Sequence, residues 1–123
     1  MRRSDADKAG LIGPEKPLAF SGSSLADLRA FPETARRQAG RQLWRVQHGI
    51  EPLDWKPMSI VGPGTIEIRI HTGREHRVFV VARFEEAVYV LHVFEKKSQK
   101  TPQREITVAR QRYQDLVQRP RKP

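Results

Sequence analysis

The side chains best suited to chemistry lie on three segments in the second half of the chain that have strand-like patterns. Residues 65–71 and 76–84 alternate in character, and residues 87–95 are almost continuously apolar. If these strands pair as hairpins, one face of the predicted sheet carries several cationic side chains around an aromatic ring. The set comprises Arg69, Arg77, Arg83, His92, Phe94 and Lys96, with Lys97 and Lys100 directly after the last strand.

Such a face is suited to binding RNA. Guanidinium and ammonium groups hold phosphates, and an aromatic ring stacks an unpaired base at about 1–3 kcal/mol. Cleavage needs little more, because the substrate 2′-hydroxyl can attack the adjacent phosphate while the protein neutralises charge and moves two protons. Arginine matches two phosphate oxygens, and His71, His76, His92 or a lysine of depressed pKa is suited to proton transfer. The catalytic candidates are Arg69, Arg77, His92 and Lys96.

Each of these residues also has a purely structural interpretation. A sheet arginine such as Arg83 is often solvated or paired with a carboxylate such as Glu67. A histidine in an apolar strand, as His92 is, is more often a hydrogen-bonded core residue than a catalyst, and Phe94 suits a core by composition alone. The lysines that follow are typical of a solvated loop. No single residue decides between the two interpretations.

Helices are expected before and after the strands. A short helix is predicted from Ser23 or Ser24 to about Ala30, and Pro32 is expected at the first position of a second helix that ends near His48. The apolar residues of the second helix step by four, four, three and four, which predicts a buried stripe of Ala35, Ala39, Leu43, Val46 and Ile50. A separate cationic ridge is a candidate for RNA binding, with a solvated surface as the alternative; it consists of Arg37, Arg41 and Arg45.

The connections predict the fold class. Residues 51–64 contain three prolines and two glycines, which is typical of a loop between helices and sheet. Short links at Thr72-Gly73 and Glu85-Glu86 indicate an antiparallel meander, and an extra edge strand is considered at Lys16–Ser21. Thr101-Pro102 begins a last helix. We therefore predict an α+β domain: an antiparallel sheet with N-terminal helices and a C-terminal helix, all packed on one face.

Length and charge indicate one basic domain. The 123 residues suffice for a single modest core. We expect a flexible arm in residues 1–16, the domain in 17–118 and a basic tail in 119–123. The formal net charge is +9, and residues 17–118 alone contain 16 basic and 11 acidic residues, so the domain keeps about +5. This favours a polyanionic partner, with nucleic acid first and an acidic protein second.

Several functional classes are disfavoured. The absence of cysteine excludes disulfides and thiolate metal sites. No apolar run approaches the roughly 18 residues of a membrane span, and the amino terminus lacks the apolar core of a signal peptide, so we expect a cytoplasmic protein. There is no glycine-rich phosphate loop, no zinc-like spacing of the four histidines and no serine nucleophile elbow. We expect no metal and no cofactor.

Taken together, these motifs resemble the RelE/HigB-like toxins of bacterial type II toxin–antitoxin systems, and in particular their phage Gp49-like branch. The shared pattern is a strand ending in Ile68-Arg69, a strand opening with Arg77, a Leu-His-x-Phe-x-Lys-Lys strand end, then Lys-Thr-Pro and a helix rich in alanine and arginine. The resemblance covers roughly residues 17–118. Its most specific part is the segment LHVFEKKSQKTPQREITVARQR, residues 91–112.

The resemblance implies a RelE-like (microbial RNase-like) fold and ribosome-dependent, metal-independent cleavage of mRNA, which inhibits translation. It also implies a cognate helix-turn-helix (HigA-like) antitoxin, with a hetero-oligomeric toxin–antitoxin complex on operator DNA. Position by position, Arg69 and Arg77 match the strand arginines, and such basic residues contact or polarise the scissile phosphate in the superfamily. Phe94, Lys96 and Lys97 match the strand end, and His92 matches the motif histidine.

Two departures leave the proton-transfer group open. Phe79 stands where relatives often have tyrosine, and the chain ends in RPRKP instead of a tyrosine-bearing tail. Two alternatives of other classes also remain. The same fold carries ParE-like proteins that inhibit DNA gyrase through a protein-binding surface, and a phage-derived nucleic-acid-binding protein without catalysis is the third hypothesis. The cationic sheet face favours RNA cleavage over both.

Overall fold

The fold is built around a five-stranded sheet, in a computed structural model that describes residues 15–120. The strand order is β2-β6-β5-β4-β3. β2 runs parallel to β6, and the other neighbours are antiparallel, so the predicted meander of three central strands is confirmed. The strands are β2 (Leu18–Phe20), β3 (Trp55–Pro57), β4 (Thr65–His71), β5 (Glu75–Val81) and β6 (Val88–Lys96).

Helices α1 (Ser24–Arg29) and α2 (Glu33–Gln47) cover one face of the sheet. The predicted stripe of α2 packs against isoleucines and valines of β4, β5 and β6; its buried members are Ala35, Ala39, Leu43 and Val46. Ile50 was wrongly included, because α2 ends at Gln47 and the chain then turns at Gly49, which has φ of +74°. Pro32 precedes the helix as its N-cap instead of taking the first helical position.

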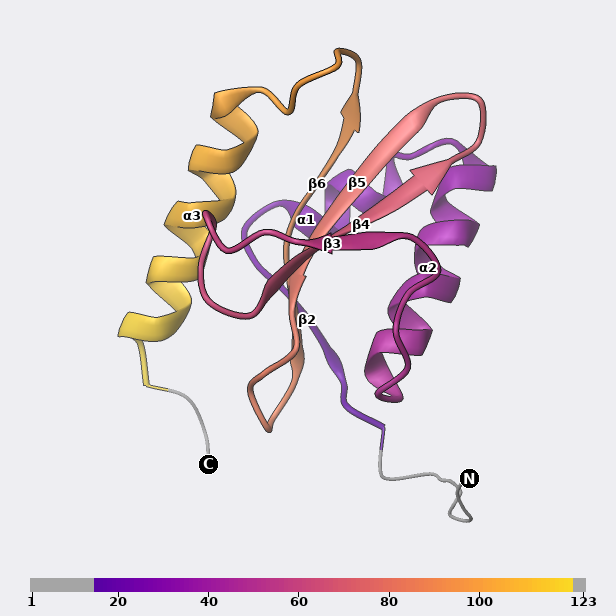
Figure 1. Ribbon diagram of the computed structural model, residues 1–123. Helices are drawn as coiled ribbons and strands as arrows, with labels where there is room; N and C mark the ends of the chain where they lie inside the picture. Colours follow the sequence, from indigo (N-terminus) through magenta and orange to yellow (C-terminus); the bar gives the residue numbers. More distant parts are fainter. Residues whose placement is uncertain (1–14, 121–123) are drawn as a thin grey trace.

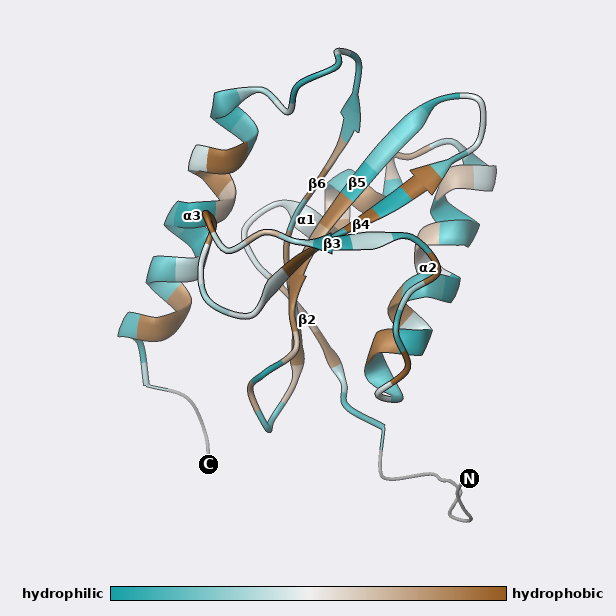
Figure 2. Ribbon diagram, viewed as in Figure 1, coloured by the Kyte–Doolittle hydropathy of each residue, from teal (hydrophilic) through white to brown (hydrophobic). Residues whose placement is uncertain are grey.

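Helix α3 (Gln103–Gln118) packs on the opposite face, so the prediction that all helices share one face is wrong. Figure 1 shows α2 and α3 on two sides of the sheet. Side chains of α3 form a second core with Phe79 and Leu91 of the central strands. The nearly continuous apolar pattern of β6 was the signal for this, because a strand covered on both sides alternates little. In Figure 2 the apolar strand segments lie between the helices.

Two short strands form the sheet edges. The extra edge strand considered near Lys16–Ser21 is present as β2. The interpretation of residues 51–64 as loop throughout is wrong, because β3 pairs with β4 at the other edge. β3 includes Pro57, which lacks an N–H and is tolerated at an edge. β5 ends at Val81 instead of Phe84, so the connection to β6 is longer than the predicted Glu85-Glu86 turn.

A β-bulge in β6 sets the direction of the side chains that follow it. Phe79 pairs with His92 and Val80 pairs with Val90, so Leu91 is an extra residue without a partner in β5. Leu91 belongs to the core beneath α3, and His92 contacts α3 as well. The bulge therefore shifts the alternation by one residue and turns the end of β6 toward the face that carries Arg77.

The ends of the predicted domain are only partly described. Residues 1–14 of the predicted arm and 121–123 of the predicted tail lie outside the described residues. Lys16, which we assigned to the arm, is attached to the fold, since its Nζ donates to the carbonyls of Ala82 at 2.7 Å and Phe84 at 2.9 Å. No helix within residues 15–120 has the length and apolar character to cross a bilayer.

The packing of α3 gives a stability prediction with a neighbouring control. Leu116 is fully buried, whereas Val117 is 41% exposed. We expect Leu116→Ala to lower the free energy of unfolding by about 2–5 kcal/mol through lost burial and a residual cavity, and Val117→Ala to change it by about 0.5 kcal/mol or less. Urea denaturation followed by circular dichroism measures both. Equal effects of the two substitutions would mean that α3 does not cover the sheet as described.

Candidate active site

A cleft of about 380 Å³ lies on the α3 side of the sheet. Its floor is set by the strand register, because Arg69 of β4 lies directly opposite Arg77 of β5, and Arg77 lies opposite Phe94 of β6. One carboxylate, Glu67, lines the cleft together with cations from the strands and from the loop after β6. The cations are Lys56, Arg69, Arg77, Lys96 and Lys100. The cleft is therefore strongly positive, as a phosphate site requires.

Arg77 is the most enclosed of these cations. It is 7% exposed, and its Nη1 donates to Glu75 Oε1 and to the carbonyl of His76, each at 3.0 Å. Within the described chain, no protein group accepts a hydrogen bond from its Nε or Nη2. Arg77 and Lys96 line both the cleft and an adjoining groove. Arg77 therefore lies where the two hollows meet, with part of its guanidinium held and part open to an anion.

Arg69 is held less tightly, by the carboxylate that precedes it on the same strand face. Its Nε lies 3.3 Å from Glu67 Oε1, and its Nη1 lies 4.0 Å from Asp54 Oδ1. Glu67 is 1% exposed, and its Oε2 has no hydrogen-bond partner among residues 15–120. We had considered Glu67 only as a counter-ion. The strand alternation that places it beside Arg69 was the signal that a carboxylate belongs to this site.

The lysines after the bulge have different surroundings. Lys96 donates from Nζ to the carbonyls of Ser98 at 2.7 Å and Gln99 at 2.5 Å, so its charge orders the loop that borders the cleft. Lys100 lines the cleft itself, and Lys97 lines the adjoining groove. The structure therefore brings the predicted residues Arg69, Arg77, Lys96 and Lys100 together, with Lys97 beside them.

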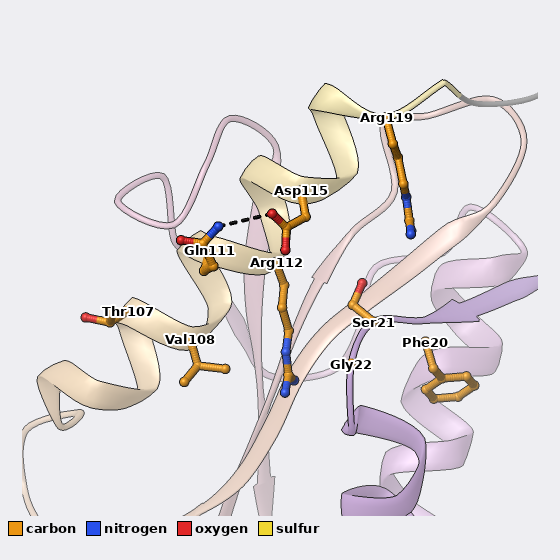
Figure 3. A pocket seen from close by; sticks show the side chains of 9 residues that line it. All are labelled: Phe20, Ser21, Gly22, Thr107, Val108, Gln111, Arg112, Asp115 and Arg119. Atoms are coloured by element: carbon orange, nitrogen blue, oxygen red, sulfur yellow. Dashed lines mark hydrogen bonds between the residues drawn. The ribbon is translucent and has the colours of Figure 1, made fainter.

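His92 lies outside the cleft lining, beneath α3. Its Nε2 is 2.7 Å from Glu105 Oε1, and its Nδ1 is 3.4 Å from Arg112 Nη1. Arg112 also donates to the carbonyl of Leu91 at 2.9 Å. Figure 3 shows Arg112 extending from α3 toward Gly22, where a Cβ atom would lie only 2.6 Å from Arg112 Nε. These contacts fasten α3 to the sheet, which is a structural role for His92.

Phe94 is a core side chain in this structure. It is 8% exposed, its ring stacks on His92 with centroids 5.3 Å apart, and the edge contact with Phe79 has a centroid distance of 5.4 Å. A ring enclosed on two sides in this way offers little surface to a nucleobase. The geometry agrees with the structural alternative for Phe94 more closely than with base stacking.

The remaining predicted RNA contacts lie elsewhere. Arg83 donates from Nη2 to the Tyr113 hydroxyl at 2.9 Å and sits 4.4 Å from the centre of the Phe84 ring, away from the cleft lining. The α2 ridge is on the helix that covers the opposite sheet face. Of that ridge, Arg37 forms an ion pair with Glu33 at 2.7 Å. The structure does not unite these four arginines with Arg69 and Arg77.

Two further histidines have pKa values that are shifted in opposite directions. His71 lies between Glu75, 2.8 Å from its Nδ1, and Asp54 at its Nε2, and the hydrogen bond to Glu75 raises the pKa of His71, with a further contribution from Asp54. The same contact with His71 lowers the pKa of Glu75. His76 faces the α1–α2 side beside Phe31, and burial lowers its pKa. Within the described residues, no group of three or more carboxylates or imidazoles could hold a metal ion.

The sheet with helices before and after it is a RelE-like α+β fold, as predicted. Residues 26–114 match the model of the family described as phage-derived protein Gp49-like (DUF891). The chain belongs to this family, a branch of the RelE/HigB-like toxins. The match includes every cation of the cleft. No curated protein matches the chain.

The His71–Glu75 contact predicts a pH dependence. We expect the His71 ring to titrate above its ordinary pKa of 6.5 and the Glu75→Gln substitution to lower that value. Because the folded pKa is raised, the stability from His71 is complete below about pH 6.5 and is lost as pH rises through the folded pKa. The stability from Glu75 depends on pH in the opposite direction, because its folded pKa is lowered. This stability is complete above about pH 4.5 and is lost as pH falls through the folded pKa.

Proton NMR titration of the imidazole signals measures these values. His76 is the internal comparison, since burial should bring its pKa below 6.5. A His71 that titrates at or below 6.5 in the wild type, or that does not respond to Glu75→Gln, would contradict the described geometry.

Proposed function

We propose that the protein is the toxin of a type II toxin–antitoxin system, a metal-independent endoribonuclease that cleaves mRNA on the ribosome and so inhibits translation. One observation carries the proposal: Arg69 and Arg77 face the same cleft from adjacent strands, with guanidinium atoms free to bind a phosphate. Membership of a toxin-like, phage-derived family supports the biological class. The charge of the cleft supports the substrate class.

In the proposed mechanism the substrate supplies its own nucleophile. The ribose 2′-hydroxyl gives up its proton and attacks the adjacent phosphorus. The bond to the 5′-oxygen breaks, and this oxygen takes a proton from water, which leaves a 2′,3′-cyclic phosphate and a 5′-hydroxyl. Arg77 and Arg69 bind the non-bridging oxygens and stabilise the additional negative charge of the pentavalent intermediate. Lys96 shapes the loop at the cleft border, through its two carbonyl contacts. His92 contributes through the Glu105 contact that holds α3 beside the cleft.

Glu67 is the proposed acceptor of the 2′-hydroxyl proton. It is the carboxylate in the described cleft lining, and its Oε2 is buried without a hydrogen-bond partner in the described chain. A carboxylate beside two guanidinium groups can take a proton while they hold the phosphate. The test is Glu67→Gln, which keeps the shape and removes the basic oxygen. An undiminished cleavage rate in that variant would exclude Glu67 as the base.

The proposed partners follow from the family. They are mRNA on the ribosome, a cognate HigA-like antitoxin with a helix-turn-helix domain, and operator DNA bound by the hetero-oligomeric toxin–antitoxin complex. A toxin-like family supports a neutralising partner in general. Action on ribosome-bound mRNA also places the proposed protein in the cytoplasm.

Tightly repressed expression in a bacterial host, with mRNA 5′ ends mapped before and after induction, separates this function from its alternatives. We expect growth arrest with new in-frame 5′ ends for the wild type and neither for Arg77→Ala. Arrest without new ends would indicate a protein target, as in the ParE-like alternative. Harmless expression would indicate the non-catalytic nucleic-acid-binding alternative.

The size of the Arg77 effect can be measured with purified protein and ribosomes programmed with mRNA. Loss of one donor to a developing oxyanion costs about 2–4 kcal/mol, so Arg77→Ala should cleave roughly 30- to 1000-fold more slowly. Arg29→Ala removes the same charge from an exposed position on α1 and should cleave at the wild-type rate. Because Arg77 is buried, its replacement can also destabilise the fold. Arg77→Lys is therefore measured alongside Arg77→Ala, and thermal unfolding curves show whether both variants are folded. Near-wild-type cleavage by folded Arg77→Ala would remove Arg77 from the mechanism.

A further inference from the structure

The outer face of α2 carries a groove that the proposed nuclease does not use. It has a volume of about 520 Å³ and lies between α2 and the loop that follows it. Its walls come from Gly40, Arg41, Gln42, Trp44, Arg45 and Leu53. The α2 members lie on the side of the helix away from its buried alanine and leucine stripe, apart from Gln42, which is buried. α2 covers one sheet face and the cationic cleft lies on the other.

The groove is held open by specific hydrogen bonds. The backbone N–H of Leu53 donates to Gln42 Oε1 at 2.7 Å, and Arg45 Nε donates to the carbonyl of Glu51 at 2.7 Å. These contacts fix the loop against α2, and they leave the Leu53 side chain 77% exposed. Trp44 is 53% exposed, although its ring lies against that of His48, with centroids 4.1 Å apart and ring planes tilted by 30°. Large apolar side chains that are held in place yet uncovered mark an interaction surface.

The charges around the groove select the partner. Arg41 has no ion-pair or hydrogen-bond partner among residues 15–120, and Arg45 has only its Nε engaged. The rim is therefore positive and complements acidic side chains. Nucleic acid suits the groove less well, because the Trp44 ring is already packed against His48 and the aliphatic wall of Leu53 cannot stack a base. Arg37 of the same ridge is already paired with Glu33. The arginines of this ridge are better placed to frame an apolar contact than to follow a phosphate backbone.

We propose that this groove docks an acidic amphipathic helix of a partner protein. Apolar residues of the partner at i, i+4 and i+7 would cover Trp44 and Leu53, and flanking glutamate or aspartate would meet Arg41 and Arg45. Gly40 supports a helix as the occupant. Apart from its chain neighbours and the adjacent backbone of α2, no described atom lies within 4 Å of the position that a Cβ would take, so a second backbone can approach closely. The inference is independent of RNA cleavage, and a partner bound here leaves the cleft on the other sheet face accessible.

The test uses the isotope-labelled full chain and three probes. The first is a helical peptide of about 18 residues with leucines at i, i+4 and i+7 between glutamates. The second is its twin with lysine in place of glutamate, and the third is a short oligouridine. The Trp44 indole N–H and the Gly40 amide report on the groove in proton–nitrogen correlation spectra, and the Lys96 and Lys100 amides report on the cleft. We expect only the acidic peptide to shift the groove signals.

Variants provide the controls. Leu53→Ser should weaken binding of the acidic peptide by at least about tenfold, and Arg41→Glu should transfer the preference to the lysine twin. Val117→Ser, which alters an exposed apolar residue on α3, should leave binding unchanged. Groove shifts caused by oligouridine would identify a nucleic-acid surface and overturn the proposal. The proposal would also be overturned if the acidic peptide did not shift the groove signals, or if Leu53→Ser bound the acidic peptide as tightly as the wild type. None of these results affects the interpretation of the cleavage assay, because the groove and the cleft lie on different faces of the sheet.

Discussion

The site depends on two like charges that the sheet holds directly opposite each other, Arg69 on β4 and Arg77 on β5. Like charges that lie directly opposite each other on adjacent strands are destabilising. Each arginine is offset by a glutamate two residues earlier on the same strand face, Glu67 for Arg69 and Glu75 for Arg77. The compensation is partial, because the carboxylates occupy only some of the guanidinium nitrogens. A phosphate between the arginines would complete it.

The rest of the fold keeps this pair accessible while burying its surroundings. Helices on both faces enclose the central strands, and α3 is fastened to the sheet through Glu105 and Arg112. The bulge at Leu91 turns the last residues of β6 toward the arginine pair, and the loop held by Lys96 then borders the cleft. α2 remains on the far face with its own exposed groove. Catalysis and partner binding can therefore occupy different sides of one small domain.

Local patterns in the sequence were sufficient to predict most of the fold. Alternation placed Arg69 and Arg77 on one strand face, and spacing placed the α2 stripe in the core. The apolar pattern of β6 indicated cover on both sheet faces, but the assignment of α3 to one of them depends on how the loop after β6 crosses the sheet end, which the pattern does not encode. β3 was missed because it is only three residues long and contains proline, which favours loops, so only its pairing with β4 marks it as a strand. The bulge at Leu91 leaves no local signature in a uniformly apolar strand.

The site residues could be predicted where strand alternation puts cationic side chains on one face. They could not be predicted where contacts with other elements decide whether a side chain is exposed. Arg69, Arg77, Lys96 and Lys100 were placed together by period and proximity. His92 and Phe94 share their face, but α3 and Phe79 cover them, which only tertiary packing decides. Arg83 was separated from the set because β5 ends at Val81. The apolar groove on α2 combines helix and loop residues, so the arginine spacing alone indicated a charged ridge and not its apolar neighbours.

The central claim is that the arginine pair stabilises attack by the RNA's own 2′-hydroxyl. The most direct measurement uses programmed ribosomes whose mRNA carries a single 2′-deoxynucleotide on the 5′ side of the mapped scissile phosphate. We predict that the wild-type protein leaves this message intact and cuts the all-ribose message to a 2′,3′-cyclic phosphate and a 5′-hydroxyl. Cleavage of the deoxy-substituted message at the same bond would contradict the claim, since the nucleophile would then have to come from elsewhere.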